Sequence, residues 1–143
     1  MTTQQAEAVR VEALSWMGTR FRHEAQVKGV GVDCVHLAIA VYESAGLLRR
    51  GFTAAHYSPD WMLHTGAERL IAGVMAHCDP AGPPWEVGDL LLYRYGRAVS
   101  HCGIYVGDGR LVHAVSRQSV RCDQVDMPAL TSRFAGGYRI RTV

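Results

Sequence analysis

The sequence predicts an α+β domain in which N-terminal helices pack on an antiparallel β-sheet. In the N-terminal half, apolar residues recur at helical spacing. A proline-rich break follows at residues 79–84. Beyond it, short β-branched and aromatic runs alternate with glycine-containing turns, a pattern typical of strands. Helices followed by a run of strands favour an α+β fold over an alternating βαβ fold.

Two helices are expected near the N-terminus, at residues 4–17 and 34–45. In the first, apolar side chains recur against glutamine, glutamate and arginine. The second follows Asp33, a favourable N-cap, and precedes Gly46, a favourable residue just past a helix end. It is apolar nearly all round, so we expect it to be deeply buried. Residues 19–33 show no sustained period and are expected to form a loop.

The rest of the chain is expected to supply one more helix and the sheet. Apolar residues return at helical spacing over residues 60–77, which predicts the third helix. No repeat or internal linker interrupts the sequence, and its length suits a single domain over residues 1–143. The strands are expected at residues 88–95, 100–107, 110–116 and 137–143.

Composition excludes several classes of function. The net charge is only +2 and the basic residues are scattered, which argues against binding to nucleic acid. No apolar run is long enough for a membrane span. The N-terminus lacks the basic start and apolar core of a signal peptide, so we expect synthesis in the cytoplasm without one. The four cysteines are widely spaced, which does not indicate a disulfide framework.

Cys34 occupies the first turn of the second predicted helix, and three interpretations compete. Unpaired backbone N–H groups and the helix dipole favour a thiolate there, and the same amides could hold an oxyanion. Taken alone, however, the position is more typical of a small buried side chain. A zinc ligand is the third interpretation. The candidate ligands lack the short spacings of structural zinc sites, so no metal or cofactor is expected.

A nucleophilic cysteine needs a base and a group that orients the base. His101 and His113 lie on two consecutive predicted strands. A three-residue loop at residues 107–109 would make them diagonal neighbours on one face of the sheet. A two-residue turn at residues 108–109 would place them on opposite faces. The sequence leaves these two connections open.

The other histidines are weaker candidates. His36 follows Cys34 by two positions, so on a helix the two side chains point about 200° apart. We expect His36 to make one hydrogen bond beside the core. The set that remains is Cys34 as nucleophile, His101 as base and His113 as the group that orients the base.

These residues and their surroundings resemble the NlpC/P60 family of papain-like cysteine peptidases. The resemblance runs from about residue 10 to 116. It implies a papain-like α+β fold with the nucleophile at a helix N-terminus. It also implies a peptidoglycan endopeptidase that cuts stem peptides between γ-linked D-glutamate and a diamino acid. The segments that carry it are WMGTRFRHEA, GVDCVHLAIAVYESAGL and VGDLLLYRYGRAVSHCGIYVGDGRLVHAV.

The resemblance assigns roles residue by residue. Cys34 matches the family nucleophile, His101 the base and His113 the third, polar residue. Asp33 and Ser100 each precede a catalytic position. They match positions that the family uses to bind the free amino end of the stem peptide.

Two segments depart from the family pattern. Phe21 stands where the family often has tyrosine, so the hydrogen bond of that hydroxyl must come from elsewhere. Val35-His36 replaces a Ser-Gly pair that often follows the cysteine. Both changes are expected to alter the substrate pocket, in which Phe21 is expected to contact the substrate.

The short form, without a signal peptide or an added wall-binding domain, resembles the subset of the family found in phage tails and gene-transfer agents. That subset implies local opening of the cell wall, with the peptidoglycan stem peptide and phage tail-tip proteins as partners. We therefore expect incorporation in a phage tail or similar particle. Two alternatives stay open. One is acyl transfer or amide hydrolysis on another substrate, and the other is a non-catalytic tail-tip assembly protein.

Overall fold

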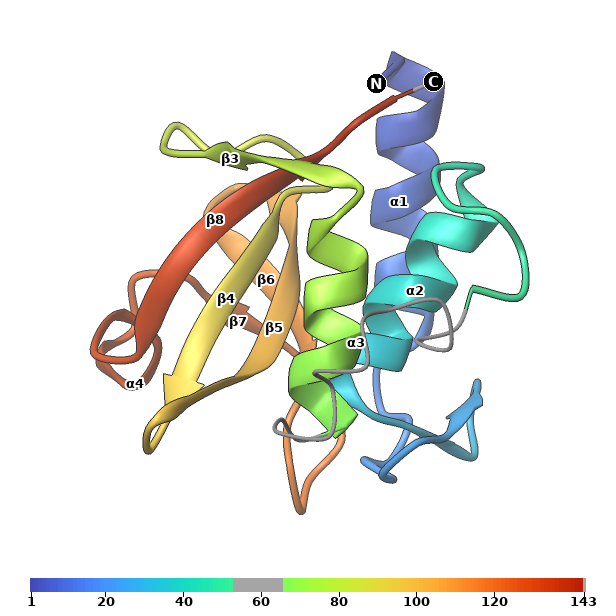
Figure 1. The fold of residues 1–143 in the computed structure, drawn as a ribbon. Coiled ribbons are helices and arrows are strands. Elements are labelled where there is room, and N and C mark those ends of the chain that lie inside the picture. The colour runs from blue at the N-terminus through green and yellow to red at the C-terminus, as the bar shows by residue number, and fades with distance from the viewer. Residues whose placement is uncertain (53–65, 143) are drawn as a thin grey trace.

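A computed structural model describes residues 1–52 and 66–142 of the chain (Figure 1). Its helices are α1 (Thr3–Ser15), α2 (Cys34–Ser44), α3 (Gly66–Met75) and α4 (Pro128–Thr131). Its strands are β1 (Gln26–Val27), β2 (Gly31–Val32), β3 (Cys78–Ala81), β4 (Leu90–Tyr95), β5 (Ala98–Gly107), β6 (Arg110–Ala114), β7 (Val120–Gln124) and β8 (Phe134–Ile140). Among the described helices, none is long and apolar enough to cross a membrane.

The main sheet has the strand order β3-β8-β4-β5-β6-β7, and each neighbouring pair is antiparallel. Helices α1, α2 and α3 lie together beside this sheet (Figure 1) and pack on it mainly through β5. On the opposite face, Leu130 of α4 packs with Leu91, Tyr93 and Leu111. This arrangement confirms the predicted α+β fold of N-terminal helices on an antiparallel sheet.

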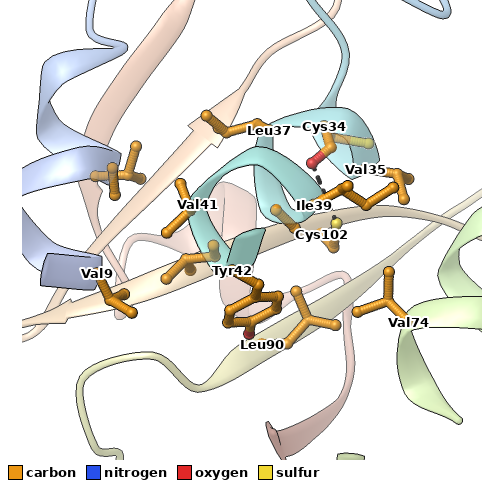
Figure 2. Packing of buried hydrophobic residues seen from close by; sticks show 14 of the residues in the cluster. Val9, Cys34, Val35, Leu37, Ile39, Val41, Tyr42, Val74, Leu90 and Cys102 are labelled. Carbon is orange, nitrogen blue, oxygen red and sulfur yellow. Dashed lines mark hydrogen bonds between the residues drawn. The ribbon is translucent and has the colours of Figure 1, made fainter. Parts of the chain in front are cut away.

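Helix α2 is the central element of the core, as its sequence predicts. Asp33 caps it by accepting a hydrogen bond from the His36 amide at 2.8 Å. Beyond the C-cap Ala45, Gly46 adopts a φ of +75°, a conformation that glycine takes without strain. The helix is therefore anchored along its length. Figure 2 shows its side chains between α1, α3 and the sheet, with Leu37, Ile39, Val41 and Tyr42 all buried.

The hydroxyl of Tyr42 ties α2 to the start of the sheet. It donates a 2.7 Å hydrogen bond to the carbonyl of Gly88, and the side chain is fully buried. The Tyr42→Phe substitution should lower the free energy of unfolding by about 1–2 kcal/mol, because it leaves the Gly88 carbonyl without its donor. Urea denaturation measures this loss. Tyr138→Phe is the matched control, because its hydroxyl makes no hydrogen bond within the described residues. Equal losses in both variants would contradict the prediction.

Two segments expected to be irregular contain strands. Residues 19–33 include the antiparallel hairpin β1–β2, whose connection places Gly29 at a φ of +80°. Strand β3 overlaps the predicted proline-rich break and pairs with β8 at the edge of the sheet. An edge strand leaves one row of its amides unpaired, so Pro80 is accommodated there.

The C-terminal part of the chain departs most from the sequence prediction. Neither β7 nor α4 is predicted. Strand β6 ends two residues earlier than expected, and β8 begins three residues earlier. The helix expected at residues 60–77 is found as α3, and residues 60–65 of that prediction lie outside the described residues.

Candidate active site

The turn between β5 and β6 combines a two-residue connection with a β-bulge. Gly107 pairs with Arg110 across residues 108–109, both of which have positive φ. The pairing shifts by one residue before that point, so Tyr105 lies opposite Leu111. A short turn alone would put the two histidines on opposite faces, and the bulge reverses that parity. Of the two connections that the sequence left open, the two-residue turn is present, and the bulge adds the shared face that the three-residue loop implied.

His101, His113 and Asp123 form a chain of hydrogen bonds across three neighbouring strands. Nε2 of His101 lies 2.8 Å from Nδ1 of His113. Nε2 of His113 lies 2.8 Å from Oδ2 of Asp123. Burial lowers the pKa of His113 and outweighs the opposing effect of Asp123, so this ring is neutral at neutral pH. His101 is thus held by a neutral imidazole backed by a carboxylate.

Cys34 lies where the start of α2 meets β5. Its thiol donates to the carbonyl of Ser100 at 3.6 Å, and the residue is only 5% exposed. Its own carbonyl accepts a hydrogen bond from the thiol of Cys102 at 3.5 Å (Figure 2). Cys102 points into the core beneath α2, away from the face that carries His101, as strand alternation predicts.

The surroundings of Cys34 favour its thiolate. The neighbouring Cys102 thiol lowers the pKa of Cys34 most, and the His101 ring lowers it further. Together these contacts outweigh burial, which alone would raise that pKa. The pKa of Cys102 is raised well above its usual value by its contact with Cys34 and by burial, so it remains a thiol donor. Of the two thiols, Cys34 is therefore the one whose thiolate is favoured.

Cys34 and His101 open onto one pocket of about 390 Å³. Phe21 and Ser100, two of the predicted substrate contacts, also line it. A hollow of about 850 Å³ lies elsewhere, between the start of α1 and strands β3 and β8, and no cysteine or histidine lines it. The complete lining of the smaller pocket is Phe21, Cys34, Tyr95, Ser100, His101, Val115 and Ser116.

Asp33, the other predicted substrate contact, does not line this pocket and is held by internal hydrogen bonds. One carboxylate oxygen accepts from the His36 amide and lies 2.7 Å from the ring Nδ1 of His36. The other oxygen accepts from the Glu24 amide at 2.8 Å. Asp33 therefore fixes the start of α2 directly before the nucleophile. His36, expected to make one hydrogen bond beside the core, makes it to Asp33.

Two residues of the site are not predicted from the sequence. Tyr95 lines the pocket and packs its ring edge against His101, with the ring centres 5.5 Å apart. Asp123 hydrogen bonds to His113. The alternation of Val120, Arg121, Cys122 and Asp123 is the signal that could have located β7 and placed Asp123 on the histidine face. Among the described residues, no group of three or more His, Cys, Asp or Glu side chains is arranged to hold a metal ion.

The fold and the site define an α+β domain that presents a cysteine at a helix start beside a hydrogen-bonded pair of histidines on a sheet. The chain belongs to the NlpC/P60 family, whose model matches residues 15–139. No curated protein matches it significantly.

Solved structures of family members share the fold at low sequence identity. A lipoprotein-like NLP/P60 protein from Staphylococcus aureus is 16% identical, with a TM-score of 0.71 over 100% of this chain and 43% of that chain. The NlpC/p60 domain of the peptidoglycan hydrolase SagA is 20% identical, with a TM-score of 0.63 over 96% and 98%. RipD from Mycobacterium tuberculosis, a non-catalytic NlpC/p60 domain protein, is 17% identical, with a TM-score of 0.64 over 99% and 100%. The chain spans less than half the length of the S. aureus protein.

Proposed function

We propose that this protein is a cysteine peptidase that hydrolyses peptidoglycan stem peptides at the bond between γ-linked D-glutamate and a diamino acid. One observation carries the proposal. Cys34 and His101 line the same pocket, and a hydrogen-bonded chain through His113 holds His101 in place. Membership of the NlpC/P60 family and the fold shared with the peptidoglycan hydrolase SagA support the choice of substrate.

The first half of the reaction forms an acyl-enzyme. His101 takes the proton of Cys34, and the thiolate sulfur attacks the carbonyl carbon of the scissile amide. The carbonyl oxygen becomes an oxyanion beside the start of α2. There the Cys34 amide, which has no acceptor within the described part of the chain, can donate to it. The C–N bond then breaks as the imidazolium of His101 gives its proton to the leaving amine.

The second half releases the acyl group. Water enters the pocket, His101 takes one of its protons, and the oxygen attacks the thioester carbon. The C–S bond breaks, which returns Cys34 and leaves a free carboxylate on the D-glutamyl product. Ser100 and Phe21, which line the pocket, are proposed to contact the stem peptide. A contact of Asp33 with the substrate amine would compete with the hydrogen bonds that it receives from His36 and Glu24.

Digestion of purified peptidoglycan tests this function. Incubation with the protein should release stem peptides that begin at the diamino acid, and mass spectrometry of the soluble products identifies them. Cleavage of another amide or ester with unchanged peptidoglycan would favour the same site acting on a different acyl donor. Binding to peptidoglycan with no new products would indicate a non-catalytic member of the family, as RipD is.

We propose further that this activity opens the cell wall locally for a phage tail or phage-like particle, with tail-tip proteins as partners. The motivation is the resemblance of the sequence to that subset of the family. Immunogold labelling of purified particles with an antibody against the protein should then decorate the tail tip. Labelling confined to the host cell wall would contradict this setting.

A further inference from the structure

The carboxylate of Asp123 contacts His113. Its Oδ2 lies 2.8 Å from Nε2 of His113, and its Oδ1 accepts a 3.2 Å hydrogen bond from Arg121. The Asp123 side chain is 15% exposed and that of His113 is 5% exposed. The contact is therefore largely shielded from water.

Asp123 determines where the proton sits on His113. Burial raises the pKa of Asp123, but the hydrogen bonds from His113 and Arg121 outweigh it and lower that pKa, so the carboxylate is ionised at neutral pH. An ionised carboxylate only accepts hydrogen bonds. Nε2 of His113 must therefore carry the proton. Because the ring is neutral, its Nδ1 is then an acceptor.

The same reasoning applies to the ring of His101. Nδ1 of His113, as an acceptor, requires that Nε2 of His101 carry a proton. A neutral His101 then has an unprotonated Nδ1, and this is the nitrogen left to act on Cys34. A carboxylate on β7 thus selects the reactive tautomer of a histidine on β5.

We propose that Asp123 is a positioning residue that fixes the proton on Nε2 of both histidines and so leaves Nδ1 of His101 as the base for Cys34. This inference rests on the proposed function, because it adds a residue to the same site. Asp123 touches neither substrate nor thiol and acts through His113. Its negative charge also stabilises the imidazolium that His101 becomes during the reaction.

The Asp123→Asn substitution is the sharpest test, because it keeps shape and changes proton placement. Arg121 donates to Oδ1 of Asp123, so the amide oxygen of the asparagine should face Arg121 and its NH₂ should face His113. That NH₂ donates to Nε2 of His113 and moves the ring proton to Nδ1. His101 must then accept at Nε2 and carry its own proton on Nδ1. His101, the base, would then be in the tautomer whose Nδ1 cannot accept the proton of Cys34.

The three variants at position 123 should therefore lose activity in a particular order, which differs from the order that a purely structural role would give. We expect kcat/KM for stem-peptide cleavage to fall about 10- to 100-fold in Asp123→Asn, the range typical of groups that orient a site residue. Asp123→Ala leaves His113 free to choose its tautomer and should lose less activity. Asp123→Glu retains the charge and should recover part of the rate. If Asp123 only stabilised β7, the alanine variant would be the more damaged.

Two further readouts need no peptidoglycan. The rate of Cys34 alkylation by iodoacetamide should drop about tenfold at pH 6 in Asp123→Asn, which corresponds to a rise of one pH unit in the midpoint of thiolate formation. The other titratable and charged groups around Cys34 and His113 are unchanged by the Asp123→Asn substitution. They are Cys102, Asp33, His36, His101 and Arg121. In the Cys34→Ala background, ¹⁵N spectra of the histidine rings should show both protons on Nε2, and Asp123→Asn should move them to Nδ1.

Asp126→Asn is the matched control, because it makes the same chemical change at an exposed carboxylate three residues away. It should change neither tautomer nor alkylation rate. Unchanged tautomers and alkylation in Asp123→Asn would overturn the positioning role, even if the protein cuts stem peptides. Changed tautomers and alkylation in a protein that cuts no stem peptide would support the positioning role and refute the proposed function.

Discussion

Replacing Cys34 with alanine is expected to lower the rate of stem-peptide cleavage by at least on the order of 10⁴-fold, as loss of a nucleophile does in other triads. The fold should survive. The residue is buried at the start of α2, but within the described residues its thiol donates only a long hydrogen bond, to the Ser100 carbonyl. Cleavage is measured by liquid chromatography of a synthetic tetrapeptide that contains γ-D-glutamyl-diaminopimelate. Thermal unfolding of the same samples verifies that they are folded.

Cys122→Ala provides the matched control. That cysteine is half-buried on β7, and burial raises the pKa of its thiol above the ordinary value. The Cys122→Ala variant should keep full activity, and the Cys122 thiol of the unchanged protein should react slowly with iodoacetamide. Substantial cleavage by Cys34→Ala, or equal loss in both variants, would refute the assignment of Cys34 as nucleophile.

Helix α2 and the place of Cys34 at its start could be predicted because their signals are local. Asp33 and Gly46 mark the two ends, and the apolar run between them indicates burial. Each signal depends on neighbours within one turn of the chain. The helix that positions Cys34 is therefore readable without knowing what it packs against.

The pairing of the two histidines depends on longer-range geometry. Whether they share a face is decided by the bulge between Tyr105 and Gly107, which forms only where β5 and β6 meet. The turn at residues 108–109 taken alone indicates the wrong parity. A family resemblance could assign both histidines, but the residue pattern could not decide their contact.

The sequence pattern did not predict Asp123 as a residue of the site, for a related reason. Strand β7 has only five residues, and its pairing with β6 places Asp123 opposite Leu111. A short edge strand with two charged residues carries little periodic signal. The contact between Cys34 and Cys102 joins positions 68 residues apart and is likewise set by tertiary packing.

Loss of the Asp33 carboxylate should reduce the stability of the fold more than the Tyr42→Phe substitution does. Asp33→Ala is expected to lower the free energy of unfolding by about 3 kcal/mol. It removes the N-cap of α2 and leaves the amides of Glu24 and His36 without an acceptor. Thr2→Ala is the matched control. Thr2 caps the exposed start of α1 with a hydroxyl, and its loss should cost about 1 kcal/mol.

The effect of Asp33 should depend on pH because its partner titrates. Burial raises the pKa of Asp33, but the hydrogen bonds from the ring and amide of His36 and from the Glu24 amide outweigh it and lower that pKa. Its stabilisation is thus present above about pH 4 and is lost as the pH falls through the lowered value. The hydrogen bond to Asp33 raises the pKa of His36. That stabilisation is fully present below about pH 6.5 and is lost as the pH rises through the raised value.

Both contributions therefore coexist between about pH 4 and 6.5. Urea denaturation at pH 5.5 and pH 8.5 should show a greater loss for Asp33→Ala at the lower pH. Thr2→Ala should lose the same amount at both, since its capping partner Gln5 does not titrate. An equal loss for Asp33→Ala at the two pH values would show that the ion pair with His36 adds nothing to the cap. Because Cys34 follows Asp33 directly, the same variant should also lose peptidase activity while it is still folded.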